Sequence, residues 1–158
     1  MLSLEYIAGF FDGEGCIGIY PRKCKTSKRG ETYRLLVSLT QKGLCPVLVE
    51  VQERFGGYLG WYKAKEALIW KVEDRKAEAF LEVIVPFLRL KRDQAELALQ
   101  FQGRKKSIQE CSRKGMQGFQ GMTDEEFAYQ KAISDMLKSL KRPELPTQDE
   151  IEAVLETR

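Results

Sequence analysis

The nine residues Ile7-Ala8-Gly9-Phe10-Phe11-Asp12-Gly13-Glu14-Gly15 hold two features that an ordinary helix avoids. The apolar segment from about Leu4 to Gly13 is predicted to form a short helix. Inside a helix a glycine costs roughly 0.5–1 kcal/mol relative to alanine, so Gly9 and Gly13 need a reason. Their four-residue spacing puts both near one helix face with Tyr6, where a second backbone can approach closely. Gly13 can also begin the helix exit, but that explanation does not extend to Gly9.

The second feature is a pair of acids, Asp12 and Glu14, at the predicted C-terminus of this helix. The helix dipole disfavours negative charge at this end. If two such helices pack through their glycines about a twofold axis, the carboxylates of both chains arrive side by side. A hard divalent cation with oxygen ligands is the usual compensation for such a cluster.

The composition narrows the chemistry that these acids can take part in. The chain has 158 residues and no histidine, which excludes Ser-His and Cys-His pairs, an imidazole base and His-containing zinc sites. The cysteines show no C-x-x-C spacing and are interpreted as packing residues or exposed bystanders, namely Cys16, Cys24, Cys45 and Cys111. Length and composition indicate one globular domain, and neither a membrane span nor a signal peptide is predicted, so we expect an intracellular protein.

The formal net charge of +3 hides an asymmetry. Residues 121 to 158 carry 5 basic and 9 acidic side chains, so the tail is −4 and the remainder of the chain is +7. Basic residues gather in two clusters of the front part, around residues 22–34 and around residues 63–71. Such clusters often only solvate a surface, but two of them favour a polyanion as partner.

The segments around the glycine-bearing helix predict an α+β fold. Residues 16–24 and 32–41 alternate as a hairpin, and a helix follows from Pro46 to Gly56. A second pair of strands over 58–63 and 67–73 precedes a helix that Asp74 can cap and that runs to the region of Pro86. The last core helix spans Lys91 to Gln102 and is expected to stop at Gly103. Antiparallel pairs without crossovers give a four-stranded sheet with helices on one face.

Residues 104–158 are predicted to form a C-terminal helical extension packed on a core of residues 1–103. Capping boxes at Thr123-x-x-Glu126 and Thr147-x-x-Glu150 open helices near 124–140 and 148–156. The first of these helices has apolar residues at helical spacing that are expected to face the core, namely Tyr129, Ala132, Ile133, Met136, Leu137 and Leu140. The extension begins with basic residues that either reach flanking phosphates or lie in a solvated loop, namely Arg104, Lys105, Lys106, Arg113 and Lys114.

The stretch from Ile7 to Gly15 resembles the LAGLIDADG motif of homing endonucleases, with Glu14 in place of the second aspartate. The resemblance covers roughly residues 4 to 102, and the order of elements predicted above matches the αββαββα core of that family, in which a saddle-like antiparallel sheet carries helices on one face. Two more segments resemble the members with a single motif. They are Thr40-Gln41-Lys42 and the run from Pro86 to Lys91, which is similar to the family's P-F-L-x-L-K.

The resemblance implies roles for individual residues. Glu14 becomes the metal-binding acid with the Gly13 carbonyl as a further ligand, while Asp12 is structural. Gln41 orders solvent or metal near the scissile phosphate, and Lys91 is the cation above the reacting group. Where some relatives place an arginine four residues after this glutamine, the chain has Cys45, and Lys42 is a candidate to supply the missing charge.

The implied function is cleavage of both strands of a long pseudo-palindromic DNA site by a homodimer. The cofactor would be Mg²⁺, with Mn²⁺ as a substitute and Ca²⁺ supporting binding without cleavage. Each chain has one motif, so the two subunits would join through the glycine-bearing helices at Tyr6, Gly9, Phe10 and Gly13. The host compartment would be the bacterial cytoplasm and nucleoid, a plastid or a mitochondrion.

The uncovered face of the sheet is the expected DNA surface, because a β-ribbon can enter the major groove. Strand alternation places there Tyr20, Arg22, Cys24, Arg34, Leu36, Ser38 and Thr40, with Lys63, Lys65 and Lys71 extending the surface. Trp61 and Trp70 are interpreted as core or sheet-edge residues rather than base-stacking platforms.

Two alternatives remain open from the sequence. The first is an intron maturase that binds RNA, or a nucleic-acid-binding relative without cleavage activity. The second is an α+β domain whose sheet binds protein, which leaves the helical glycines and the acids at the helix end unexplained.

Overall fold

The computed structural model describes residues 1–24, 30–113, 122–141 and 147–156. The elements follow in the order α1 (Leu4–Glu14), β1 (Gly15–Lys23), β2 (Glu31–Lys42), α2 (Pro46–Phe55), β3 (Tyr58–Tyr62), β4 (Ala67–Glu73), α3 (Asp74–Ile84), α4 (Arg92–Arg113), α5 (Asp124–Leu140) and α6 (Gln148–Glu156). Short 3-10 turns, η1 (Lys63–Lys65) and η2 (Val85–Phe87), join β3 to β4 and α3 to α4. This order confirms the predicted α+β class and its αββαββα core. None of the described helices is both long and apolar enough to cross a bilayer.

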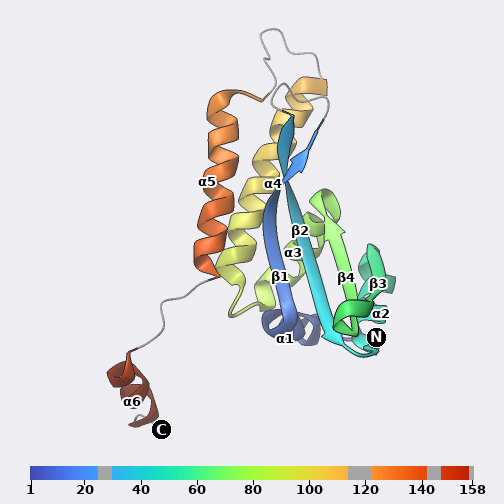
Figure 1. The fold of residues 1–158 in the computed structure, drawn as a ribbon, viewed down its shortest axis with the longest axis vertical. Helices are drawn as coiled ribbons and strands as arrows, with labels where there is room; N and C mark the ends of the chain where they lie inside the picture. Colours follow the sequence, from blue (N-terminus) through green and yellow to red (C-terminus); the bar gives the residue numbers. More distant parts are fainter. Residues whose placement is uncertain (25–29, 114–121, 142–146, 157–158) are drawn as a thin grey trace.

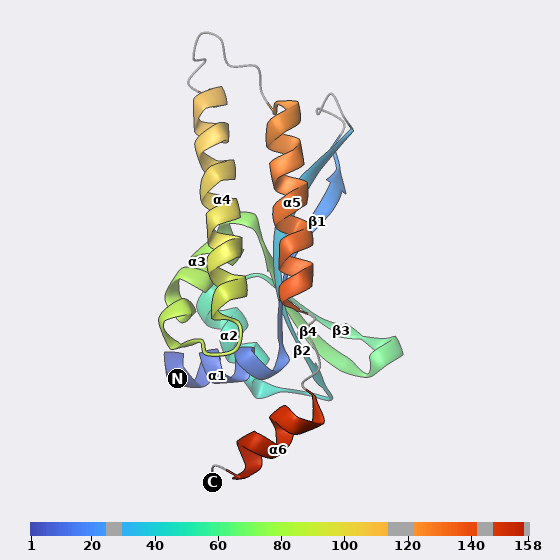
Figure 2. The same cartoon turned by 90° about the vertical axis from the view of Figure 1, so that its left-hand side faces the viewer.

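The four strands form one antiparallel sheet in the order β1-β2-β4-β3, with helices on one face (Figures 1 and 2). Along β2 every second residue from Tyr33 to Leu39 is buried, while the residues between them are half-buried. Such alternation is typical of a sheet with one covered and one accessible face. The accessible side is called the open face below.

An aromatic cluster forms the centre of the core between the sheet and the helices. The ring of Phe80 on α3 lies 5.3 Å from Phe11, 5.0 Å from Phe55 and 4.9 Å from Trp70, measured between centroids. Trp70 is fully buried and donates its indole N–H to the Gly56 carbonyl at 2.7 Å. It is therefore a core residue, as predicted, whereas Trp61 lies on the edge strand β3 and is 47% exposed.

The predicted helix end at Gly103 is wrong, because α4 continues to Arg113. Two side chains just after the glycine hold the helix to the rest of the fold. Arg104 binds Glu126 of α5 at 2.6 Å, and Lys105 binds Asp74 at 2.7 Å. These tertiary contacts outweigh the modest intrinsic cost of one helical glycine. They also place Arg104 and Lys105 in contacts within the chain, while Lys114 lies outside the described residues.

Asp74 does not cap α3 as predicted. Glu73 occupies the N-cap position without a side-chain hydrogen bond. Asp74 instead accepts from the Leu35 amide at 3.4 Å and from Lys105, and its φ of +46° lies in the left-handed region. The end of β4 is therefore bound to β2 and α4 rather than to its own helix.

The packing expected of the C-terminal extension is made by α5, which runs beside α4 and along β1 (Figure 2). Thr123 caps α5 by accepting from the Glu126 amide, as the capping box predicts. Ile133 and Leu137 are buried, but Met136 and Leu140 are exposed, so the predicted apolar face is only partly covered. The second predicted helix of the extension is α6, which lies apart from the sheet in Figure 1.

The aromatic cluster leads to a stability prediction. Phe80→Ala removes the ring that touches three other aromatic side chains and leaves a cavity, so the free energy of unfolding should fall by about 3–5 kcal/mol. Urea denaturation followed by circular dichroism measures this change. Val83→Ala on the exposed side of the same helix is the control and should change the stability far less. Equal losses in the two variants would contradict the central place of Phe80.

Candidate functional site

The outer face of α1 is accessible and carries the residues predicted for a subunit interface. Tyr6 is 52% exposed, Gly9 and Gly13 are exposed, and Phe10 is half-buried. A Cβ added at Gly9 or Gly13 would meet no atom within 4 Å. Packing within one chain therefore does not require either glycine, although both weaken the helix. Two apolar side chains near the same region also face outward, Phe87 of η2 and the largely exposed Leu90.

Asp12 shows how the fold accommodates an acid at the C-terminus of α1. Its carboxylate is buried and accepts from the backbone amides of Arg89 at 2.7 Å and Lys91 at 3.0 Å. A buried carboxylate needs such donors to offset its lost hydration. The side-chain amine of Lys91 in turn donates to the Asp12 carbonyl at the helix end. Asp12 thus attaches the segment before α4 to α1, which agrees with a structural role.

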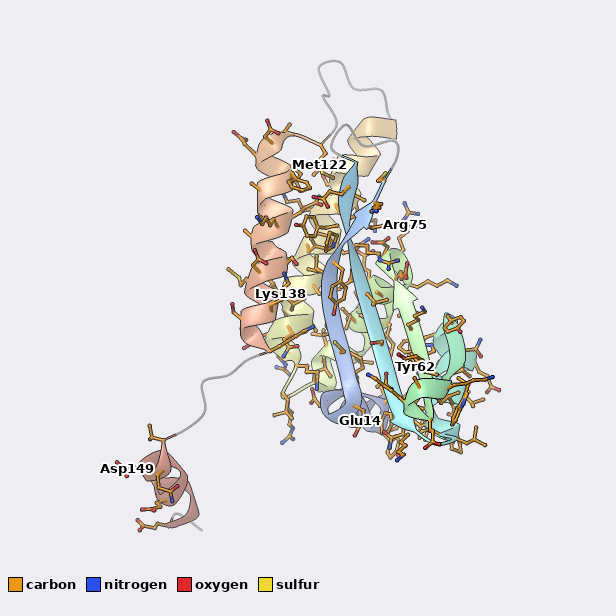
Figure 3. The ribbon with its side chains drawn as sticks, viewed as in Figure 1. Glu14, Tyr62, Arg75, Met122, Lys138 and Asp149 are labelled. Carbon is orange, nitrogen blue, oxygen red and sulfur yellow. The ribbon has the colours of Figure 1, made fainter. Side chains whose placement is uncertain are left out.

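Glu14 is the last residue of α1 and is exposed at the end of the sheet (Figure 3). The next residue, Gly15, pairs with Leu39 of β2. Gln41 lies two residues further along β2, so it reaches the same end of the sheet as Glu14. Lys91 is held there by its bond to Asp12. The structure therefore brings Glu14, Gln41 and Lys91 to the C-terminus of α1.

Lys42 and Cys45 are placed differently from these three residues. Lys42 is exposed at the end of β2, and strand alternation turns it to the open face while Gln41 faces the helices. Cys45 is only 9% exposed and belongs to the hydrophobic core. A buried neutral thiol supplies no charge to this end of the sheet.

The oxygen atoms near the end of α1 fit a hard divalent cation only in part. The helix-terminal carbonyl of Phe11 accepts from Gly15, and that of Asp12 accepts from Lys91. The Gly13 carbonyl lies between these two and Glu14 at the end of the helix. This carbonyl, the Glu14 carboxylate and the Gln41 amide oxygen are suitable hard ligands. In the described part of the chain no three His, Cys, Asp or Glu residues gather in a metal-binding cluster. One chain thus offers an incomplete set of ligands.

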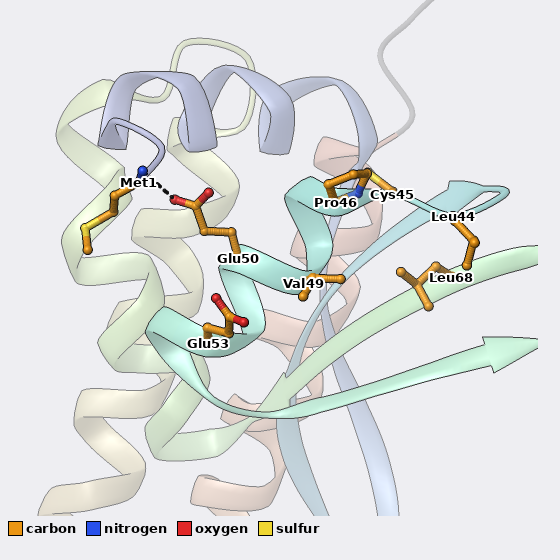
Figure 4. Close-up of a pocket in the computed structure, with 8 residues that line it drawn as sticks. All are labelled: Met1, Leu44, Cys45, Pro46, Val49, Glu50, Glu53 and Leu68. Carbon is orange, nitrogen blue, oxygen red and sulfur yellow. Dashed lines mark ion pairs between the residues drawn. The ribbon is translucent and has the colours of Figure 1, made fainter.

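A hollow of about 710 Å³ lies beside α2, away from these residues (Figure 4). Its lining is mostly apolar and includes Leu44, Val49 and Leu68. The only charged side chains in the lining are Glu50 and Glu53, and the N-terminal amine lies 3.7 Å from Glu50. Two carboxylates on an apolar surface do not suit a polyanion, so this hollow is not the nucleic-acid site.

The open face presents the side chains that alternation predicts. The cross-strand register puts Tyr20 opposite Arg34 and Gly18 opposite Leu36, and it continues through the remaining predicted strand residues, Arg22, Ser38 and Thr40. Cys24 lies just beyond the end of β1. The Tyr20 ring lies across Gly18, where an added Cβ would come within 2.2 Å of the ring. Partial burial raises the pKa of the Tyr20 phenol above its ordinary value.

Two of the three basic residues assigned to the second hairpin lie outside its strands. The strand expected over 58–63 ends at Tyr62, and Lys63 and Lys65 lie in η1. Lys71 does lie on the open face, where its amine is 4.8 Å from the centre of the Tyr58 ring. Lys63, which was predicted to end the first strand of this hairpin, and Lys65, which was predicted between the strands, both lie in the 3-10 turn at the sheet edge.

The structure adds three residues to the open face that the sequence argument missed. Tyr58 lies beside Lys71, and the amine of Lys141, which directly follows α5, lies 3.4 Å from the Cys16 sulfur. Glu73 forms an ion pair with Arg34 at 2.8 Å. Alternation along β4 was sufficient to find Glu73, which shares a face with Lys71. The approach of Lys141 depends on how α5 packs and has no local sequence signal.

Comparisons with known proteins place this geometry in a family. The family model described as LAGLIDADG endonuclease matches residues 7–103. None of the curated proteins compared with the chain matches it. Among solved structures, the homing endonuclease I-CvuI bound to DNA is 19% identical, with a TM-score of 0.70 over 98% of this chain and 92% of that chain.

Two further structures share the fold at lower coverage. The archaeal intron-encoded homing endonuclease I-Vdi141I, complexed with DNA, is 18% identical, with a TM-score of 0.55 over 86% of this chain and 96% of that one. The LAGLIDADG meganuclease I-AabMI, bound to uncleaved DNA, is 19% identical, with a TM-score of 0.66 over 85% of this chain but only 46% of the other. The match to the family model spans well over half of the sequence, and the chain belongs to the LAGLIDADG endonuclease family.

Proposed function

We propose that the protein is a site-specific DNA endonuclease that cuts both strands of a long pseudo-palindromic site as a homodimer. The observation that carries this proposal is that Glu14, Gln41 and Lys91 lie at the same end of the sheet, near the C-terminus of α1 and beside its exposed glycine face. The reported relatives support it, since I-CvuI was solved with DNA in the presence of magnesium and of calcium.

Each residue of the site has a chemical task in this proposal. Glu14, the Gly13 carbonyl and Gln41 would hold Mg²⁺, for which Mn²⁺ substitutes. The metal ion, when bound, supplies an activated water and stabilises charge on the phosphoryl oxygens. Lys91 is fixed at the site by the Asp12 carbonyl and donates to the phosphate or the leaving oxygen. Lys42 is a second candidate cation, approaching from the open face.

Two observations support the homodimer: one chain holds no cluster of three acidic, His or Cys residues among those described, and the glycines of α1 are exposed. A second copy packed on α1 about a twofold axis brings a second Glu14 and a second Lys91, one set for each DNA strand. Gly9 and Gly13 would then allow the two α1 helices to approach closely. Within one chain they have no such role, because no other element of the described chain comes within 4 Å of a Cβ added at either glycine. The match to only 46% of the I-AabMI chain also supports this view, because a chain of that length has room for two copies of this fold.

The open face is the proposed DNA surface. Its strands carry Arg22, Arg34 and Lys71 among hydroxyl and apolar side chains, a mixture suited to phosphate and base edges. A second candidate function is DNA binding without cleavage. The burial of Cys45, which leaves its position without charge, favours this candidate.

The proposed function has a direct test. Incubation with a randomised duplex library should give discrete double-strand breaks at one approximately palindromic sequence with magnesium, and none with calcium or without metal. Sequencing of the ends measures the result. Specific binding of one sequence without cleavage under any metal ion would contradict the nuclease function. It would support the second candidate function, DNA binding without cleavage.

The second prediction concerns Glu14. Glu14→Gln keeps the shape but removes the charge of the metal-binding acid, so cleavage should fall at least about a hundredfold while DNA binding in calcium persists. Cleavage time courses and gel shifts on the selected target measure the two effects. Glu53→Gln, an exposed acid on α2, is the control and should leave both unchanged. Loss of binding with Glu14→Gln would show that this acid is structural.

The third prediction concerns Gly9. A Cβ added at Gly9 has no atom within 4 Å, so Gly9→Leu should be tolerated within one chain. The leucine would obstruct the approach of a second α1, so the protein should become monomeric and lose double-strand cleavage. Sedimentation analysis measures the mass, and circular dichroism confirms the helix content. Gly103→Leu makes the same change at an exposed helical glycine without close neighbours on α4, and this control should remain a dimer. A Gly9→Leu dimer would contradict the α1 interface.

A further inference from the structure

An ion pair between two strands stands out on the open face. Both carboxylate oxygens of Glu73, at the end of β4, lie 2.8 Å from the same nitrogen of Arg34, Nη1. The two side chains are 31% and 36% exposed, so the pair is accessible from the face proposed to meet DNA. Arg34 lies five residues along β2 from Leu39, which faces Gly15. At the usual rise this is roughly 17 Å from the end of the sheet that carries Glu14.

Glu73 is the only acid among the described strand residues of the open face. A carboxylate on a surface that binds a polyanion lowers affinity, because it repels the phosphates. An accessible ion pair contributes little to folding stability, so stability does not account for it. A repulsive group at a binding surface is instead a common means of specificity.

The geometry of the pair leaves part of the guanidinium unused. Glu73 accepts from Nη1 only, and among the described residues nothing accepts from Nη2. Nε is buried without a hydrogen-bond partner, so the donors left for DNA are on the terminal nitrogens. An arginine whose fork is only partly satisfied retains donors for a further acceptor. In the major groove the acceptors that suit an arginine are O6 and N7 of guanine, while a carboxylate accepts from N4 of the paired cytosine.

The backbone around both residues is held from the covered face of the sheet. The amine of Lys105 on α4 donates to the Tyr33 carbonyl at 2.9 Å and to Asp74 at 2.7 Å. Asp74 also accepts from the Leu35 amide at 3.4 Å. The residues on both sides of Arg34 are thus connected to the residue that follows Glu73. This network gives Arg34 and Glu73 fixed positions relative to each other, and Lys105 is its positioning residue.

We propose that Arg34 and Glu73 act as one unit that selects a G·C base pair in the outer part of each half-site. Arg34 donates to the guanine. Glu73 accepts from N4 of the cytosine and holds Nη1 of Arg34, so that this nitrogen does not bind a phosphate. Base pairs without a donor at the position of N4 leave the carboxylate unpaired and bind less tightly. This inference rests on the proposed function, because it needs the open face to bind DNA.

The experiment measures binding in calcium to the selected target and to all its single-base-pair substitutions. The unmodified protein should discriminate at least about tenfold for G·C at one position of each half-site. Glu73→Gln should reduce this preference to about threefold or less and leave the other positions unchanged. Arg34→Lys keeps the charge but loses the fork, so it should lose the same preference while the salt dependence of binding stays the same.

Glu31→Gln is the matched control, since it removes one negative charge from the same sheet but on the opposite face. It should leave the substitution profile intact, and thermal unfolding confirms that all variants fold. If Glu73→Gln changes the affinity equally at every base pair of the target, the proposal that the pair selects a G·C base pair is overturned. If the unmodified protein binds no sequence specifically, the proposed function itself is contradicted rather than the pair alone.

Discussion

The candidate site depends on one buried carboxylate. Asp12 lies in the last turn of α1, where the helix dipole disfavours an acid, and the backbone amides of Arg89 and Lys91 offset that cost. The same two bonds decide where the chain arrives before α4. They bring Lys91 to the end of the helix that carries Glu14, so a single structural acid aligns two separated segments at the site.

Much of the fold could be predicted from the sequence, because its signals are local. The alternation of β2 and the glycines after α2 define their elements without knowledge of the rest of the chain. Gly103 shows the limit of such signals. A glycine ends a helix when nothing holds the next turn, but here Arg104 and Lys105 bind α5 and the β4–α3 junction. Those partners are distant in sequence and cannot be read from the helix itself.

The site shows the same division between local and distant information. The two faces of the first hairpin were predictable from alternation, including the face on which Arg34 lies. Three features were not predictable: the placement of Lys63 and Lys65 in a 3-10 turn, the burial of Cys45 and the approach of Lys141 to Cys16. Each depends on how separate elements pack rather than on a repeating pattern. The roles of Glu14, Gln41 and Lys91 stay predictions until cleavage is measured.

The presence of one LAGLIDADG helix, α1, in each chain has a consequence for how such a protein can change its target. In a twofold dimer every side chain on the open face meets DNA twice, once in each half-site. A substitution that weakens one half-site contact tenfold therefore weakens the whole complex about a hundredfold, because free energies at well-separated sites add. In the proposed homodimer, retargeting by single substitutions is correspondingly abrupt, and the twofold symmetry of the dimer restricts it to targets whose two halves change together.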